Sequence, residues 1–152
     1  DVGPTGAAGE KGDKGDTGPA GPTLATYISA VLTTGQAVDV NASVDFSEAI
    51  IVSNGFSAPT TTFIVPNTGV YKISVGLTGS SGTSTVALGV NGVPLSQGTF
   101  ITNASTLTSV IFNLVLTADD VITLENVSGT PYTVPTPASA MVEGYVEIHQ
   151  IQ

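Results

Sequence analysis

Residues 61–78 read TTFIVPNTGVYKISVGLT and contain two strand patterns separated by a turn. In the second pattern, apolar side chains stand at 71, 73, 75 and 77, with Lys72, Ser74 and Gly76 between them. Successive side chains of a strand point to opposite faces of its sheet, so this strand has one apolar face. The intervening Asn67-Thr68-Gly69 consists of residues that favour turns. The stretch predicts strands of a sheet with one buried face.

Short strands and turns continue through residues 24–152, which are rich in Val, Thr, Ser, Ile and Leu. Asn91-Gly92 predicts a tight hairpin because both residues tolerate positive φ, and Asn54-Gly55 and Ser128-Gly129 mark further turns. The prolines at 131–137 exclude a central strand there. No window keeps helical periodicity beyond about two turns. We predict an all-β sandwich of ten strands, near 25–32, 37–46, 49–53, 61–65, 69–78, 83–90, 99–102, 106–116, 121–127 and 139–151.

The first 23 residues have a different organisation. From residue 3 to residue 23 every third residue is glycine, which gives seven consecutive Gly-X-Y triplets. Only glycine fits at the crowded axis where three polyproline-like chains meet, so this period predicts a collagen-like stalk. The triple-helix glycines are Gly3, Gly6, Gly9, Gly12, Gly15, Gly18 and Gly21.

The stalk composition indicates its source. No Y position holds proline, whereas animal collagens depend on hydroxyproline there; instead Lys11 and Lys14 occupy Y and precede Asp13 and Asp16, so that neighbouring chains can form ion pairs. We therefore expect a bacterial or viral protein without prolyl hydroxylation. So short a tract is expected to be the end of a longer stalk. Because the chain begins at Asp1 without Met or a signal peptide, we expect a fragment or a processed product.

Charge is sparse and mainly negative. The 152 residues contain 3 Lys+Arg and 12 Asp+Glu, a net charge of −9. This argues against nucleic acid, which requires a basic surface, and against anionic lipid. The absence of Cys excludes disulfides and Cys–zinc sites. No apolar run approaches the roughly 20 residues of a membrane span. Lys72 is the only cation after the stalk, so we expect it beside a carboxylate, with Glu125, Glu143 and Glu147 as candidates.

A collagen segment needs three chains, so the β domain attached to it is predicted to trimerise. A preassembled trimer holds three stalk chains at high effective concentration and so offsets the entropy of bringing them together. The domain must then bury a threefold surface. Because like charges near a symmetry axis repel, that surface should be apolar and rich in hydroxyl groups.

A collagen stalk followed by a β head resembles the complement C1q and tumour necrosis factor superfamily. Phe63, Gly69, Tyr71 and Ile73 follow the spacing of that superfamily's aromatic–Gly–aromatic segment, although Ile73 stands where it usually has Phe. Leu116–Ile122 is similar to its strand–turn–strand, and Gly144-Tyr145 to its C-terminal Gly-aromatic strand. The resemblance implies a ten-stranded jelly roll, homotrimeric heads and a family-motif core at Phe63, Gly69, Tyr71, Ile73, Gly144 and Tyr145.

A closer resemblance is to the collagen-like exosporium glycoproteins of Bacillus and Clostridium relatives. It rests on the run from Phe63 to Tyr71, the Val90-Asn91-Gly92 hairpin, the turn at 117–122 and two Gly-Pro-Thr triplets. It implies a structural protein of the spore surface, in which the head forms the distal knob of a hair-like nap. It also implies O-linked sugars on stalk threonines, here Thr5, Thr17 and Thr23.

Catalytic and metal signatures are weak. His149 is the only histidine and lies near the C-terminus, so we expect it at the surface or an interface, and we expect no enzyme. Asp119-Asp120 is interpreted as a turn and the start of the next strand. A weak calcium site at this pair is the alternative, because calcium prefers oxygen ligands. No other cofactor is predicted.

Three functions remain open at this stage. The first is a structural spore-surface trimer whose head nucleates the stalk. The second is an adhesin or a receptor- or glycan-binding head, in which Tyr132 of the proline-rich loop is the tyrosine expected to be exposed, while Tyr71 and Tyr145 are assigned to the core. The third is a phage fibre knob. All three place the head outside the cell.

Overall fold

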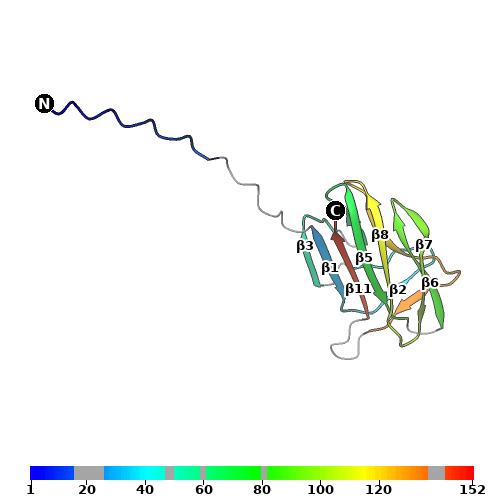
Figure 1. Cartoon of the computed structure of the whole chain (residues 1–152). Helices are drawn as coiled ribbons and strands as arrows, with labels where there is room; N and C mark the ends of the chain where they lie inside the picture. Colours follow the sequence, from blue (N-terminus) through cyan, green and yellow to red (C-terminus); the bar gives the residue numbers. More distant parts are fainter. Residues whose placement is uncertain (16–25, 47–49, 59–60, 80–81, 137–142) are drawn as a thin grey trace.

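A computed structural model of the chain describes residues 1–15, 26–46, 50–58, 61–79, 82–136 and 143–152. Residues 1–15 form neither helix nor strand, every one of them is exposed, and Figure 1 draws them as an extended trace. This conformation suits a Gly-X-Y segment, but a triple helix needs three chains and stays a prediction. Gly18 and Gly21 lie outside the described residues.

All regular structure in the described residues is β-strand, as predicted. The described residues form eleven strands, where the sequence predicts ten. They are β1 (Tyr27–Leu32), β2 (Gln36–Val38), β3 (Ile50–Asn54), β4 (Phe63–Ile64), β5 (Gly69–Leu77), β6 (Thr83–Val90), β7 (Val93–Asn103), β8 (Thr108–Leu116), β9 (Val121–Asn126), β10 (Tyr132–Val134) and β11 (Gly144–Gln150).

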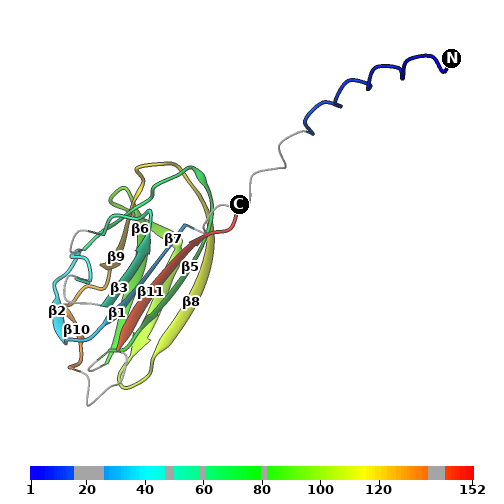
Figure 2. The same ribbon diagram turned by 90° about the vertical axis from the view of Figure 1, so that its left-hand side faces the viewer.

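Two large sheets form the layers of a sandwich. One has five strands in the order β3-β1-β11-β5-β8, and the other has four in the order β4-β9-β6-β7. Strands β2 and β10 form a separate two-stranded ribbon. All of these strand pairs are antiparallel. Figure 2 shows the five-stranded sheet as one layer in front of β6, β7 and β9, with β1 and β11 side by side.

Strand β5 confirms the alternation that predicts it. Tyr71, Ile73, Val75 and Leu77 are fully buried and point into the core between the sheets. They meet buried side chains from the other layer, such as Leu88. Apolar burial of this kind is the dominant favourable contribution to folding. The sequence pattern of one strand therefore fixes which side of the five-stranded sheet faces inward.

Buried side-chain nitrogen and oxygen atoms in the described residues all have hydrogen-bond partners. The hydroxyl of Tyr71 donates to the carbonyl of Asn67 at 2.7 Å, which ties β5 to the turn before it. The amide of Asn126 is fully buried and donates to the carbonyls of Val38, Asp39 and Thr130. An unsatisfied buried amide would cost about 1–3 kcal/mol, so these bonds fix the loops around β9.

The Asn91-Gly92 hairpin is confirmed. Both residues have positive φ, 53° and 75°, and they connect β6 directly to β7. The Asn91 side chain also donates to Asp120 at 2.8 Å and accepts the backbone N–H of Val121 at 2.9 Å. The hairpin is thereby tied to the turn between β8 and β9 at the same end of the sandwich.

Two predicted strand boundaries are wrong. The strand expected at 37–46 ends at Val38, because the chain turns at Asn41, whose φ is 63°, and the N–H of Ala42 donates to Asp39. The strand expected at 99–102 extends over Val93–Asn103, because β7 begins directly after the hairpin. The sequence predicts no strand at 132–134, because three prolines surround it; the structure has the three-residue strand β10 there, beside β2 and not central.

Tyr132 gives a prediction for alkaline pH. Burial raises the pKa of its hydroxyl to about 12, and the hydroxyl donates to the carbonyl of Thr78 at 2.6 Å. Because the folded-state pKa of Tyr132 lies above its unfolded value of about 10, the protonated hydroxyl stabilises the folded head relative to the unfolded chain. This contribution is complete below pH 10 and is lost as the pH rises towards 12. The stabilisation lost over this pH range should be about 2 kcal/mol.

We expect Tyr132→Phe to destabilise the head by about 1–3 kcal/mol near neutral pH, because the Thr78 carbonyl loses its donor. The same variant should lose part of the fall in stability between pH 10 and pH 12. Denaturant unfolding at pH 7, 10 and 12 measures both effects. Tyr27→Phe, on the sheet surface, is the matched control and should change neither; an unchanged pH profile in Tyr132→Phe would contradict the assignment.

Candidate assembly face

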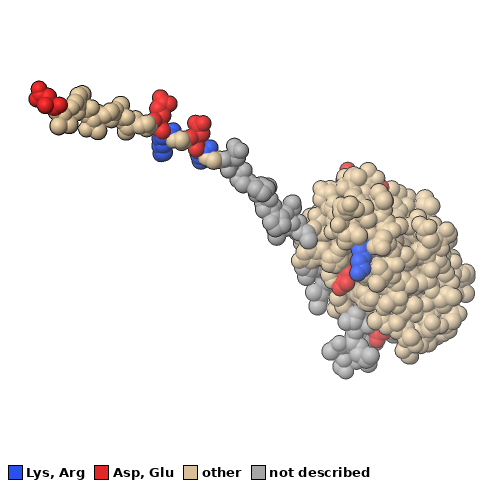
Figure 3. All heavy atoms as spheres, in the orientation of Figure 1, with Lys and Arg blue, Asp and Glu red and all other residues tan. Residues whose placement is uncertain are grey.

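The solvent-facing side of the five-stranded sheet is the candidate site. We call it the outer sheet face and define it by the residues that alternate with the core residues of β1, β11, β5 and β8. Of these described side chains only Lys72 and Glu147 carry a full charge at neutral pH. Figure 3 shows a head surface with a single cationic patch and few acidic ones. The members are Tyr27, Ser29, Val31, Val70, Lys72, Ser74, Gly76, Ser109, Ile111, Asn113, Val115, Tyr145, Glu147 and His149.

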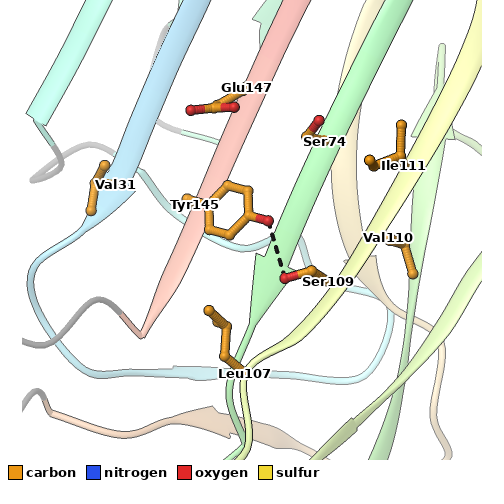
Figure 4. Close-up of a pocket in the computed structure, with 8 residues that line it drawn as sticks. All are labelled: Val31, Ser74, Leu107, Ser109, Val110, Ile111, Tyr145 and Glu147. Carbon is orange, nitrogen blue, oxygen red and sulfur yellow. Dashed lines mark hydrogen bonds between the residues drawn. The ribbon is translucent and has the colours of Figure 1, made fainter.

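Tyr145 lies flat across this face. Its strand β11 pairs with β5, where Gly76 stands directly opposite it. A Cβ at Gly76 would collide with the tyrosine ring, so the ring occupies the space left by the missing side chain. Its hydroxyl reaches over β5 to the Ser109 hydroxyl on β8 at 3.0 Å, as Figure 4 shows. The ring therefore connects three strands on the solvent side. Its assignment to the core is wrong, because it is half-buried on the outer face.

An open hollow surrounds this ring. Its volume is about 770 Å³, and its lining comes from β1, β5, β8 and β11 and the turn before β8. The walls are mainly apolar, two serine hydroxyls face it, and a single carboxylate belongs to it (Figure 4). The lining residues are Val31, Ser74, Leu107, Ser109, Val110, Ile111, Tyr145 and Glu147.

His149 lies on the outer sheet face, as expected from the sequence. Its ring stacks on Tyr27 of β1, with 5.7 Å between ring centroids and 13° between planes. On its other side it stands opposite Lys72 of β5. Neither neighbour is a serine or an acid, so this is not the arrangement of a hydrolytic triad.

Lys72 has no ion pair within the described part of the chain. Of its three candidate partners, Glu125 lies on β9 in the other sheet and Glu143 precedes β11. Glu147 shares the outer sheet face: it stands opposite Ser74, two positions along the strand from the His149–Lys72 pair. It is the diagonal neighbour of Lys72, so Lys72 lies beside a carboxylate as expected, although the two side chains form no ion pair in the described part of the chain.

Strands β7 and β8 form edges of the two sheets on one side of the sandwich, where they contact each other. Neither contains a charged residue. Ile111 and Val115 of β8 are 62% and 79% exposed, and Ile101 of β7 is 55% exposed. Phe112 and Leu114 are only partly buried at this open side of the core. Long uncharged edges are usually blocked in monomers, so this side is suited to contact another chain.

Asp119 and Asp120 form a turn, which supports the simpler interpretation of this pair. Asp119 has φ of 70°, and the Asp120 carboxylate accepts bonds from the N–H of Thr117 at 2.7 Å and from Asn91. The bond from the Thr117 backbone N–H makes the larger contribution, and together with the bond from Asn91 it holds the pKa of Asp120 below its ordinary range. Both oxygens are engaged, and the described residues contain no cluster of three or more acidic, His or Cys ligands.

The ligand-loop interpretation of Tyr132 is wrong. Tyr132 is 1% exposed, because the pairing of β10 with β2 turns its ring into the core. Of the family-motif residues, Phe63, Tyr71 and Ile73 are in the core as expected, Gly144 is buried and Gly69 is half-buried. Thr5 is exposed, whereas Thr17 and Thr23 lie outside the described residues.

Sequence reasoning missed the hollow and the Tyr27–His149 stack. The alternation of Gly144–Gln150 already places Tyr145, Glu147 and His149 on one face. The strands that complete the face come from other parts of the chain, and β1 with Tyr27 lies more than a hundred positions away, so only the strand order reveals them. Gly76 within a strand was the one local signal, since such a glycine often marks a close approach.

No protein-family model matches this sequence, and a search of curated proteins gives no match either. Solved structures do match. The globular domain of zebrafish complement 1qA protein has a TM-score of 0.62 at 16% identity, covering 84% of this chain and 98% of that one. Eiger TNF from S. frugiperda has a TM-score of 0.60 at 14% identity, covering 84% and 93%. PRD1 vertex protein P5 has a TM-score of 0.55 at 14% identity, covering 86% and 100%. The chain therefore has a C1q/TNF-like jelly-roll fold.

The described residues include no helix long and apolar enough to cross a membrane.

The close approach of Tyr145 to Gly76 can be tested directly. We expect Gly76→Ala to push the ring away, break its bond to Ser109 and destabilise the head by about 1–3 kcal/mol. In the background of Tyr145→Ala the same substitution should cost much less, because the ring is absent. A double-mutant cycle by denaturant unfolding measures this coupling. Equal costs of Gly76→Ala in the two backgrounds would contradict the contact.

Proposed function

We propose that the head forms a homotrimer through its outer sheet face and its β7–β8 side, and that this trimer aligns three collagen-like stalk chains. The observation that carries the proposal is the covalent union of seven Gly-X-Y triplets with a C1q/TNF-like head. The triplets require three chains, and two different surfaces of the head with little charge, the outer sheet face and the β7–β8 side, can join neighbouring copies in a ring. The proposed role is structural, without catalysis.

The two surfaces differ, so the contact joins unlike patches of neighbouring copies. In a cyclic trimer, the β7–β8 side of one copy packs on the outer sheet face of the next, and three such contacts close a ring. Ile111 and Val115 would lose their exposure, and the uncharged edges would be covered. The scarcity of charge on both surfaces supports this arrangement, since buried unpaired charge is costly.

The chain ends also support an axis on the outer sheet face. Strand β1 lies in the interior of the five-stranded sheet and begins at Tyr27, a member of this face. The backbone N–H of Gln150 donates to the Thr26 carbonyl, so the start of the head is fixed beside its last strand. If this face is turned towards the axis, three copies of Thr26 come close together. This is where three stalk chains must meet.

We propose further that this is a surface protein of a bacterial spore, with the trimer as the knob of an exosporium filament. The support is the resemblance of the Phe63–Tyr71 run and the Gly-Pro-Thr triplets to that group. Sugars would be carried by Thr5, Thr17 and Thr23. A phage fibre knob is the second candidate, because the fold is shared with a protein named as a vertex protein. The glycan-binding alternative depended on an exposed Tyr132, and this support is lost because Tyr132 is buried.

The trimer is tested by the mass of the whole chain in solution. We expect analytical ultracentrifugation to give three times the monomer mass at micromolar concentration, and a melting temperature that rises with protein concentration. Ile111→Glu should weaken the trimer at least about tenfold, because it places a charge in the contact. Val40→Glu, at an exposed valine in the turn after β2, is the control and should leave assembly unchanged. A monomeric wild-type chain would overturn the proposal.

A further inference from the structure

The only cation of the head and the only carboxylate of the outer sheet face are both unpaired among the described residues. Lys72 lies on β5 and Glu147 on β11, and both side chains are exposed. In a single chain this costs nothing, because water solvates both groups. An assembly that buries the face changes this: an unpaired ammonium or carboxylate would then be costly to remove from water. Each chain contributes one lysine and one glutamate to this face, so every ammonium in an assembly can have one carboxylate partner, either in its own chain or in a neighbouring copy.

The hollow has the chemistry that a lysine side chain requires. Val31 and Ile111 provide apolar walls for a methylene stem, because lysine commonly buries its stem and keeps its ammonium polar. Glu147 provides the counter-charge. The ring of Tyr145 provides an aromatic face, which attracts cations. The two serine hydroxyls can accept hydrogen bonds from an ammonium.

The chain's own Lys72 does not occupy this hollow. It stands between His149 and Asn113 in the strand register and is absent from the lining, whereas Ser74, the next outward residue of β5, is part of it. The head contains no other lysine or arginine. Within one chain the cation nearest to the hollow is Lys72 itself, which lies outside the lining, and a second copy of the chain supplies another such lysine.

We propose that, at the threefold axis where the outer sheet faces of the three copies converge, Lys72 of one copy enters the hollow of the next copy and pairs there with Glu147. The inference rests on the proposed trimer and names the contact that fixes its rotational register. Each copy gives one lysine and receives one, so the pairs form a closed cycle around the axis. Every full charge of the face is then compensated without any charge from another protein.

Charge reversal tests the pairing, with the whole chain and sedimentation as the measurement. Lys72→Glu and Glu147→Lys should each weaken the trimer at least about tenfold, because every contact then carries two like charges. Mixing the two variants should restore assembly, since a mixed trimer has opposite charges at two of its three contacts. Asp39→Lys, in the exposed turn after β2, changes the net charge as Glu147→Lys does and should leave assembly unchanged.

The outcomes separate this inference from the trimer itself. Recovery in the mixture supports pairing between copies. Recovery only in a single chain that carries both reversals places the pair within one chain and overturns the inference, as would trimers of unchanged affinity in both single variants. A monomeric wild type overturns the proposed function instead. Lys72→Met and Glu147→Gln keep the side-chain shapes; each should weaken assembly less than the reversals do, and equal affinity to wild type would also overturn the inference.

Discussion

The same strands of the five-stranded sheet must form a core-facing side and an outer side with different requirements, and the rest of the structure depends on this constraint. The period of two along β5 sends Tyr71, Ile73, Val75 and Leu77 into the core and leaves Lys72, Ser74 and Gly76 for the other side. The core side needs bulk and the outer side needs flatness. Gly76 meets the second need, because its missing side chain lets the Tyr145 ring lie on the sheet. A larger residue there would disturb the outer face and leave the core unchanged.

The positions of the strands show which surfaces of the head lack charge. The 12 acidic residues of the chain avoid β7 and β8 completely, and only one stands on the outer sheet face among the described residues. For an isolated domain this distribution favours aggregation, since free uncharged edges invite pairing. It is compatible with a soluble protein when those edges are covered by a defined partner. Composition alone shows that charge is scarce, and only the topology shows where it is scarce.

The sequence predicts the elements better than it predicts the site. Strand β5 and the Asn91-Gly92 hairpin follow from local rules, because alternation and positive φ depend only on near neighbours. Tyr132 fails for the opposite reason: three prolines indicate a loop, yet distant pairing with β2 turns its ring inward. Tyr145 fails because the alternation of β11 places it with Glu147 and His149, but the sequence does not show that the neighbouring strands leave this face on the outside. Both errors concern contacts between residues far apart in sequence.

In the proposed trimer, closure of the ring of three copies matters more than the strength of any one contact between them. A patch on one copy that fits a different patch on the next can grow without limit, and a ring that closes is the only form that leaves no free patch. Apolar edges such as Ile111 and Val115 supply attraction but little directionality, because apolar burial is non-directional. A polar group can supply the direction that these edges lack, since its partner must lie at a defined position. For the proposed trimer, the few remaining charges are therefore better used to set the number and register of copies than to increase their affinity.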